Sequence, residues 1–128
     1  MSVECDKVGG INLAQGVCDT DVPEVVAAAV DMAVRAGANS YTRHDGVARL
    51  RNALAVKLER DNGLKFNPEN QIVVSAGSTG AFYCAAIALL SPGDEVILFE
   101  PYYGYHLSTL QAVEAKAVYA TLRPPNWN

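Results

Sequence analysis

Two short groups of residues in the second half of the chain could bind a small molecule. Ser78 and Thr79 lie in "SAGSTG", at the end of an apolar run, and Tyr102 and Tyr103 lie in "EPYYGY", at the end of the next one. Free N–H groups at the start of a helix favour an anion, and hydroxyl groups add further donors. A tyrosine ring can lie flat against a planar ligand. Together the two groups predict a site for an aromatic ligand that carries a phosphate.

Each group also has a simpler explanation. Ser78 or Thr79 could cap the following helix without any ligand, and either tyrosine could pack in a core or an interface. Gly-Ser-Thr-Gly is a weak motif, because it lacks the lysine of a P-loop and the full G-x-G-x-x-G spacing. An alternative interpretation, a nucleotide-binding α/β module, has this motif as its only support.

The surrounding pattern predicts the elements that place these residues. Apolar residues at helical spacing and turn residues at the boundaries predict helices over 23–36, 47–60, 79–90 and 104–113. Short β-branched runs predict strands over 71–76, 95–100 and 115–122. Apolar strands that alternate with helices indicate a parallel sheet covered on both faces. If the first two strands are neighbours, both groups of residues lie at the same edge of the sheet, where α/β proteins bind ligands.

Two helices carry more detailed expectations. Asp21, two residues before Pro23, predicts the capped start of the first helix, and Gly37 predicts its end. In the second helix the leucines Leu50, Leu54 and Leu58 predict the inner face, and the charged residues Arg51, Lys57, Glu59 and Arg60 predict the outer face.

The composition limits the classes of function. The chain has 128 residues, of which 50% are hydrophobic, and a net charge of −4, so it is typical of a globular protein without a basic surface for nucleic acid or membrane. Three widely spaced cysteines, without C-x-x-C, argue against disulfides or a zinc site and favour a reducing cytoplasm. The N-terminus has no signal-peptide pattern, and His44 and His106 lie far apart in sequence, as surface or core histidines do.

Three ordered blocks resemble the class I/II aminotransferases, the fold-type I enzymes that depend on pyridoxal 5′-phosphate (PLP). They are "INLAQGVCDTDVP", "NSYTRHDGVARLRNALAVKLERDNG" and "SAGSTGAFYCAAIALLSPGDEVILFEPYYGYH". The resemblance runs from about Ile11 to the end and corresponds to the N-terminal part of such an enzyme. It implies a partial three-layer α/β/α fold with at least three mainly parallel strands. It also implies an N-terminal arm, helix and loop over 1–46 and an incomplete PLP-binding large domain over 47–128.

The resemblance also implies site residues. Ser78 and Thr79 match the phosphate-binding turn, and Tyr103 matches the aromatic residue that stacks on the pyridine ring. Tyr41 matches the tyrosine that reaches the cofactor phosphate of the neighbouring subunit in a homodimer. Gly16 matches a glycine beside the substrate carboxylate. Alternatively, Tyr41 could cover the second helix and Gly16 could serve a turn.

The resemblance names no catalytic residue within the chain. The family forms a Schiff base with a lysine after a serine-rich turn, and Lys7, Lys57, Lys65 and Lys116 all lack that context. We therefore expect an aminotransferase, acting on an amino acid and a 2-oxo acid, whose 128-residue part is inactive alone. The alternatives are a related fold-type I PLP lyase, or a truncated chain whose partner supplies the lysine.

Overall fold

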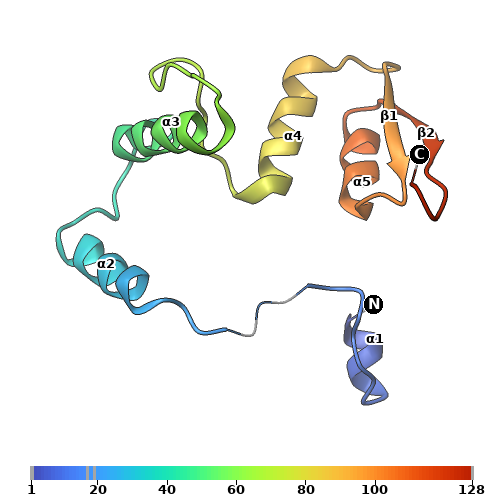
Figure 1. The fold of residues 1–128 in the computed structure, drawn as a ribbon, viewed down its shortest axis with the longest axis horizontal. Coiled ribbons are helices and arrows are strands. Elements are labelled where there is room, and N and C mark those ends of the chain that lie inside the picture. The colour runs from blue at the N-terminus through green and yellow to red at the C-terminus, as the bar shows by residue number, and fades with distance from the viewer. Residues whose placement is uncertain (1, 17, 19, 128) are drawn as a thin grey trace. The chain divides into compact units, whose positions relative to one another are not determined.

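The computed structural model describes residues 2–16, 18 and 20–127, and the chain divides into two compact units, Met1–Tyr41 and Thr42–Asn128. The fold is α/β. Figure 1 labels its elements: α1 (Ser2–Lys7), α2 (Glu24–Arg35), α3 (Ala48–Asn62), α4 (Gly77–Leu89), β1 (Glu95–Glu100), α5 (Gly104–Ala112) and β2 (Lys116–Thr121). The predicted boundary at residue 46 stays a prediction.

The first unit contains α1 and α2. The predicted cap at Asp21 is wrong, because α2 begins directly after Pro23 and has no side-chain cap. Proline suits this position, since its fixed φ is already helical and an N–H group there would lack a partner. The predicted end is confirmed: Gly37 has φ +81°, and Ala38 N donates to Ala33 O at 2.9 Å. This left-handed glycine turn satisfies the last carbonyls of the helix.

Helix α3, in the second unit, contains the clearest departure from the sequence pattern. Arg51, expected on the outer face, has no solvent exposure, whereas Leu50, expected on the inner face, is 46% exposed. The guanidinium is stable in the interior because carbonyl and carboxylate oxygens surround it. The helix ends as predicted, at Gly63 with φ +68°.

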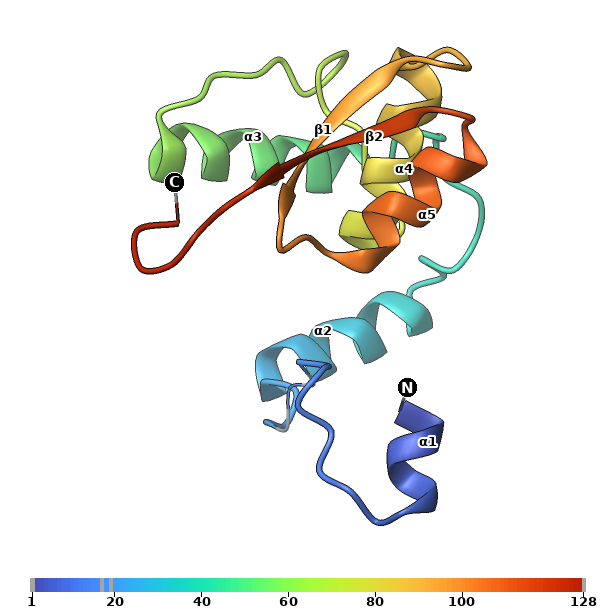
Figure 2. The same cartoon turned by 90° about the vertical axis from the view of Figure 1, so that its right-hand side faces the viewer.

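Strands β1 and β2 form a parallel pair, with Glu95 opposite Lys116 and Glu100 opposite Thr121. Figure 2 shows the two strands side by side and α4 next to α5. Backbone hydrogen bonds tie the strand starts together, from Gly93 N to Glu114 O at 2.8 Å and from Lys116 N to Asp94 O at 2.8 Å. The predicted strands over 95–100 and 115–122, and the helix that connects them, are therefore confirmed.

The first predicted strand, over residues 71–76, is not formed. Residues 71–76 are mostly irregular, because no strand of the described chain lies beside them to complete a ladder. Val74 N instead donates to Asp45 O at 3.0 Å, in the loop before α3. The described residues thus contain a two-stranded sheet where at least three strands were expected.

The sheet is covered on one face rather than on both. Leu98 is 6% exposed, while Ile97 and Phe99, which alternate with it along β1, are 64% and 62% exposed. Figure 1 shows α5 on one side of the strands and no labelled helix of the second unit on the other. Because side chains alternate across a strand, one apolar face of the sheet is open within this unit.

Candidate functional site

The start of α4 follows a tight backbone turn. Gly77 N donates to Ser75 O at 3.0 Å, and Ser75 Oγ donates to Gly77 O at 3.2 Å. Gly77 has φ +69°, a conformation that glycine adopts without strain. The residue before the helix is Ala76, and no side chain caps the helix. The simpler explanation for Ser78 and Thr79, that one of them caps α4, is therefore wrong.

The hydroxyl groups of Ser78 and Thr79 are free to meet a ligand. Both side chains are exposed, and neither hydroxyl hydrogen-bonds to another residue of the described chain. The first N–H groups of a helix have no intrahelical acceptor, and the helix dipole adds partial positive charge there. An added Cβ at Gly77 would meet no atom within 4 Å, so the approach is open. These donors fit a phosphate group.

A chain of aromatic contacts links Tyr103 to α4. Its ring meets the ring of His106 edge-on, with 5.5 Å between centroids, and His106 in turn lies 4.4 Å from Phe82. Phe82 is on α4, one helical turn after Ser78 and Thr79. The structure therefore places the predicted phosphate-binding residues and the predicted aromatic platform in one region of the second unit.

The two adjacent tyrosines have different surroundings. Tyr102 is half-buried and stacks on Tyr119 of β2, with 5.6 Å between centroids and 23° between planes. Hydrogen bonding with Tyr102, and then burial, raise the pKa of Tyr119 above its usual value. Tyr103 directly precedes α5 and keeps 55% of its surface exposed. Packing thus accounts for Tyr102, whereas Tyr103 meets the rings of His106 and Tyr105 and still keeps more than half of its surface exposed.

Tyr41 and Gly16 belong to the first unit. The Tyr41 side chain is fully exposed, and an added Cβ at Gly16 would meet no atom within 4 Å. Both positions are open, and their roles stay predictions.

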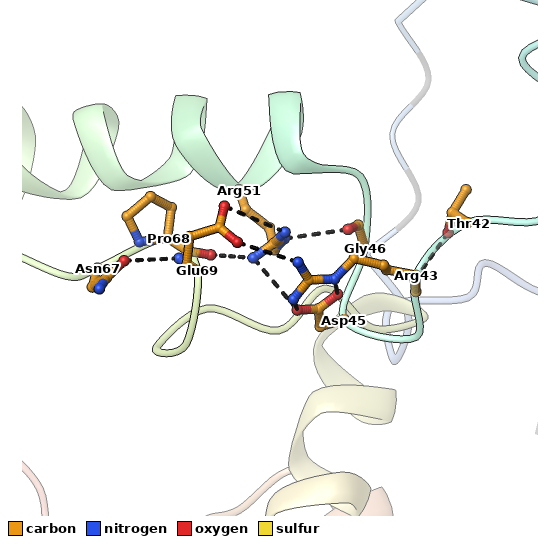
Figure 3. Close-up of polar contacts among 8 residues, drawn as sticks. All are labelled: Thr42, Arg43, Asp45, Gly46, Arg51, Asn67, Pro68 and Glu69. Atoms are coloured by element: carbon orange, nitrogen blue, oxygen red, sulfur yellow. Dashed lines mark hydrogen bonds and ion pairs between the residues drawn. The ribbon is translucent and has the colours of Figure 1, made fainter.

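A cluster of two arginines and two carboxylates, which we call the Arg–Asp cluster, was missed from the sequence (Figure 3). It consists of Arg43, Asp45, Arg51 and Glu69. Arg43 donates to Asp45 from Nε at 2.9 Å and from Nη2 at 2.5 Å, and from Nη1 to Glu69 at 3.2 Å. The hydrogen bonds from Arg43, with the charge of Arg51, hold the pKa of Asp45 below its usual range although burial opposes this. One signal was available, because Arg51 shares helical spacing with the half-buried Leu54 and Leu58.

The lysines of the chain lie in other surroundings. Three of them form exposed ion pairs: Lys7 with Glu4 at 2.6 Å, Lys57 with Asp61 at 3.3 Å and Lys65 with Glu59 at 3.1 Å. Lys116 begins β2, at the opposite end of the sheet from the β1–α5 junction that carries Tyr103. The second unit, as far as it is described, places no lysine beside Ser78 and Tyr103.

Two features are absent from the described residues. No group of three or more His, Cys, Asp or Glu side chains is arranged to hold a metal ion. No helix in this part of the chain has both the length and the apolar character needed to span a bilayer.

Comparison with known proteins gives consistent matches along the chain. The sequence profile of the family "Aminotransferase class I and II" matches residues 8–128. A probable N-succinyldiaminopimelate aminotransferase from Mycobacterium tuberculosis is 35% identical over 97% of this chain and 31% of its own length. The methionine aminotransferase of Escherichia coli is 36% identical over 99% of this chain and 33% of its own. The solved structure of the Mycobacterium tuberculosis N-succinyldiaminopimelate aminotransferase matches with a TM-score of 0.91 at 34% identity, over 98% of this chain and 33% of that one. The chain thus spans about a third of the length of these relatives.

Proposed function

Because the chain belongs to the class I and II aminotransferase family, we propose that it forms the N-terminal part of a PLP-dependent aminotransferase. The whole enzyme transfers an amino group from an amino acid to a 2-oxo acid. Residues 1–46 form its arm, first helix and loop, and residues 47–128 begin its cofactor-binding domain. The enzyme works in the cytoplasm as a homodimer.

The single observation that carries the cofactor assignment is the uncapped start of α4. Its free N–H groups and the unpaired hydroxyls of Ser78 and Thr79 would hold the phosphate of PLP. The exposed ring of Tyr103, held next to α4 through His106, would lie against the pyridine ring. When bound, PLP supplies an electron sink for the substrate's α-carbon. The residues of this chain bind and orient it.

Two residues of the first unit have further proposed roles. The fully exposed side chain of Tyr41 would reach the cofactor phosphate held by the other subunit of the dimer. Gly16, where a side chain would otherwise project, leaves room for the substrate carboxylate. Both assignments rest on the family resemblance, and the openness of both positions supports them.

The 128-residue chain alone is inactive in this proposal, because the second unit places no lysine beside Ser78 and Tyr103. One alternative keeps the cofactor and changes the reaction, since related fold-type I lyases use the same cofactor with different positioning residues. A second alternative is a chain that joins a separate polypeptide carrying the lysine. The open apolar face around Ile97 and Phe99 favours this second alternative over a free-standing unit.

Native mass spectrometry of the protein purified from its own host, with PLP added, tests the proposal. We expect the chain to retain PLP, either in a homo-oligomer or with a larger polypeptide that carries the lysine. The Ser78→Ala/Thr79→Ala double variant should lose PLP under the same conditions. A wild-type chain that never retains PLP, alone or with a partner, contradicts the cofactor assignment.

A further inference from the structure

Arg51 is a buried arginine near the start of α3. Its partners come from two segments, the loop before the helix and the turn at Pro68 after it. Its Nε donates to Gly46 O at 3.2 Å, and its Nη1 donates to Pro68 O and lies 3.4 Å from Asp45 Oδ2. Figure 3 shows the guanidinium between Pro68 and Glu69 on one side and Asp45 and Gly46 on the other. A buried charge is tolerated only with such partners. Arg51 therefore fixes the Asp45–Gly46 loop against the turn at Pro68.

One nitrogen of the Arg51 guanidinium has no hydrogen-bond partner in the described chain. Nη2 is buried and makes no hydrogen bond, with Glu69 Oε1 at 3.9 Å. Removing a partner from such a group leaves buried charge uncompensated, so the cluster has little tolerance for change. This makes the position of the Asp45–Gly46 loop sensitive to each member of the cluster.

The same loop holds the segment that leads into α4. Asp45 O accepts the N–H of Val74 at 3.0 Å, while the Asp45 carboxylate is held by Arg43 and Arg51. Gly46, with φ +101°, lies so close to Val74 that an added Cβ would come within 2.8 Å of the valine side chain. Two independent contacts thus dock Val74 on the loop.

Val74 is directly followed by the turn that opens α4. Ser75 and Gly77 close that turn with two hydrogen bonds, and Ser78 is the next residue. Because residues 71–76 have no strand beside them in the described chain, the Asp45–Gly46 contact is the backbone anchor that holds Val74. A shift of Asp45 therefore moves the start of α4.

We propose that Arg51 and Asp45 are positioning residues for the anion-binding turn at Ser78 and Thr79, acting through Gly46 and Val74. The identity of the anion rests on the proposed function. The mechanical link, by which Asp45 and Gly46 hold the start of α4 through Val74, rests on the geometry alone. Neither residue touches the ligand.

Hydrogen–deuterium exchange of the purified protein tests the link without requiring PLP. The variants are Asp45→Asn, which keeps the side-chain size, and Gly46→Ala, which places a methyl group against Val74. Arg51→Met is a third variant, and the two milder ones decide the outcome if it does not fold. The matched control is Asp61→Asn, because Asp61 also pairs with an arginine, Arg60, but on the exposed far end of α3.

We expect exchange over residues 73–80 to accelerate by about tenfold in Asp45→Asn and Gly46→Ala, the change that loss of a typical net hydrogen-bond contribution produces. Exchange in β1, α5 and β2 should stay as in the wild type, and Asp61→Asn should leave 73–80 unchanged. Unchanged exchange over 73–80 in both variants overturns the proposal. A uniform acceleration across the second unit also overturns it, because the cluster would then serve stability alone.

The affinity for PLP, measured by titration on the same samples, separates this proposal from the proposed function. A weaker affinity in Asp45→Asn, with the local acceleration, supports both. Local acceleration in a protein whose wild type binds no PLP supports the mechanical link and contradicts the cofactor assignment. Unchanged PLP affinity despite local acceleration overturns the positioning role.

Discussion

The ring of Phe82 lies 4.4 Å from the imidazole of His106, and this contact joins α4 to α5 beside Tyr103. The His106 ring meets Tyr103 on the other side, at 5.5 Å and 77°. An aromatic pair in such geometry contributes about 0.5–1.5 kcal/mol beyond its buried area. His106 is therefore a spacer between Phe82 of α4 and the ring of Tyr103.

Replacing His106 tests this spacer role. His106→Ala removes both ring contacts and should lower the free energy of unfolding by about 1–3 kcal/mol, the sum of two such pairs. His106→Phe keeps a ring and should recover most of the loss. Urea denaturation followed by circular dichroism measures both variants. Equal losses in the two variants would show that the ring contacts do not carry the effect.

Tyr103→Ala should weaken PLP binding in the complete enzyme that carries this chain. Loss of one stacking partner corresponds to about 0.5–1.5 kcal/mol, which is roughly a two- to twelvefold rise in Kd. Adding Ser78→Ala and Thr79→Ala should weaken binding further, because hydrogen bonds to a charged oxygen contribute about 1.5–3 kcal/mol each. Absorbance titration with PLP measures the affinities.

Tyr83→Ala is the control for these variants, since Tyr83 is also a partly exposed tyrosine and lies on α4. It should leave the Kd for PLP unchanged. If Tyr103→Ala and the double variant bind PLP as tightly as the wild type, the site assignment is wrong.

Tyr41→Phe tests the proposed contact across the dimer. Removal of the hydroxyl should speed PLP loss from the dimeric enzyme, because a hydrogen bond to the phosphate is lost. Cofactor release during dilution, followed by fluorescence, measures the rate. If a monomeric form of the enzyme shows the same acceleration, the hydroxyl acts within its own subunit and the cross-subunit role is wrong.

Local signals in the sequence were enough to place most elements. The β1 run is rich in residues that favour strands, and the glycine at the end of α2 adopts a left-handed conformation that few other residues adopt. Their predictions are confirmed for that reason. The prediction of a cap at Asp21 is wrong because Pro23, two residues later, itself occupies the position directly before α2.

Long-range partners were the part that the sequence pattern missed. A strand needs a neighbour, and residues 71–76 look like a strand yet dock on Asp45 by one backbone hydrogen bond. Arg51 looks exposed by its charge yet is buried, because its partners Pro68 and Asp45 come from outside the helix. Its helical spacing with Leu54 and Leu58 indicated an inward position, but the groups that stabilise its buried charge lie outside the helix, where helical spacing does not reveal them.

Acid should destabilise the second unit through Asp45. Hydrogen bonds from Arg43, with the charge of Arg51, lower the pKa of the Asp45 carboxyl in the folded chain. In the unfolded chain the group returns to its ordinary pKa of about 4, so below that pH the unfolded state binds more protons. The stabilising contribution is therefore present above about pH 4 and is lost as the pH falls through the folded pKa.

Urea midpoints measured from neutral pH down to about pH 3 check this dependence. The urea midpoint of the wild type should fall over the acid range. Asp45→Asn should have a lower midpoint at neutral pH and a smaller fall in acid. Asp21→Asn, at an exposed position of the first unit, should follow the wild-type curve. Parallel curves for the wild type and Asp45→Asn would contradict the role assigned to the carboxylate.

Two neighbouring residues of β1 test whether one face of the sheet is open. Leu98 is 6% exposed and Ile97 is 64% exposed, although both are large and apolar. Leu98→Ala should cost about 2–5 kcal/mol of unfolding free energy, because it removes buried methyl groups and leaves a cavity. Ile97→Ala should stay within about 0.5 kcal/mol, as surface substitutions do.

Substitutions at the same two residues distinguish a unit that is stable alone from one whose open face a partner covers. Ile97→Lys should reduce self-association of the 128-residue chain in sedimentation velocity, because it places a charge in the exposed apolar face. In the complex with a polypeptide that supplies the lysine, the same substitution should weaken association, since the face is then covered. If Ile97→Ala destabilises the isolated chain as much as Leu98→Ala does, the face is already covered within the chain. The open-face argument for a separate partner would then fail.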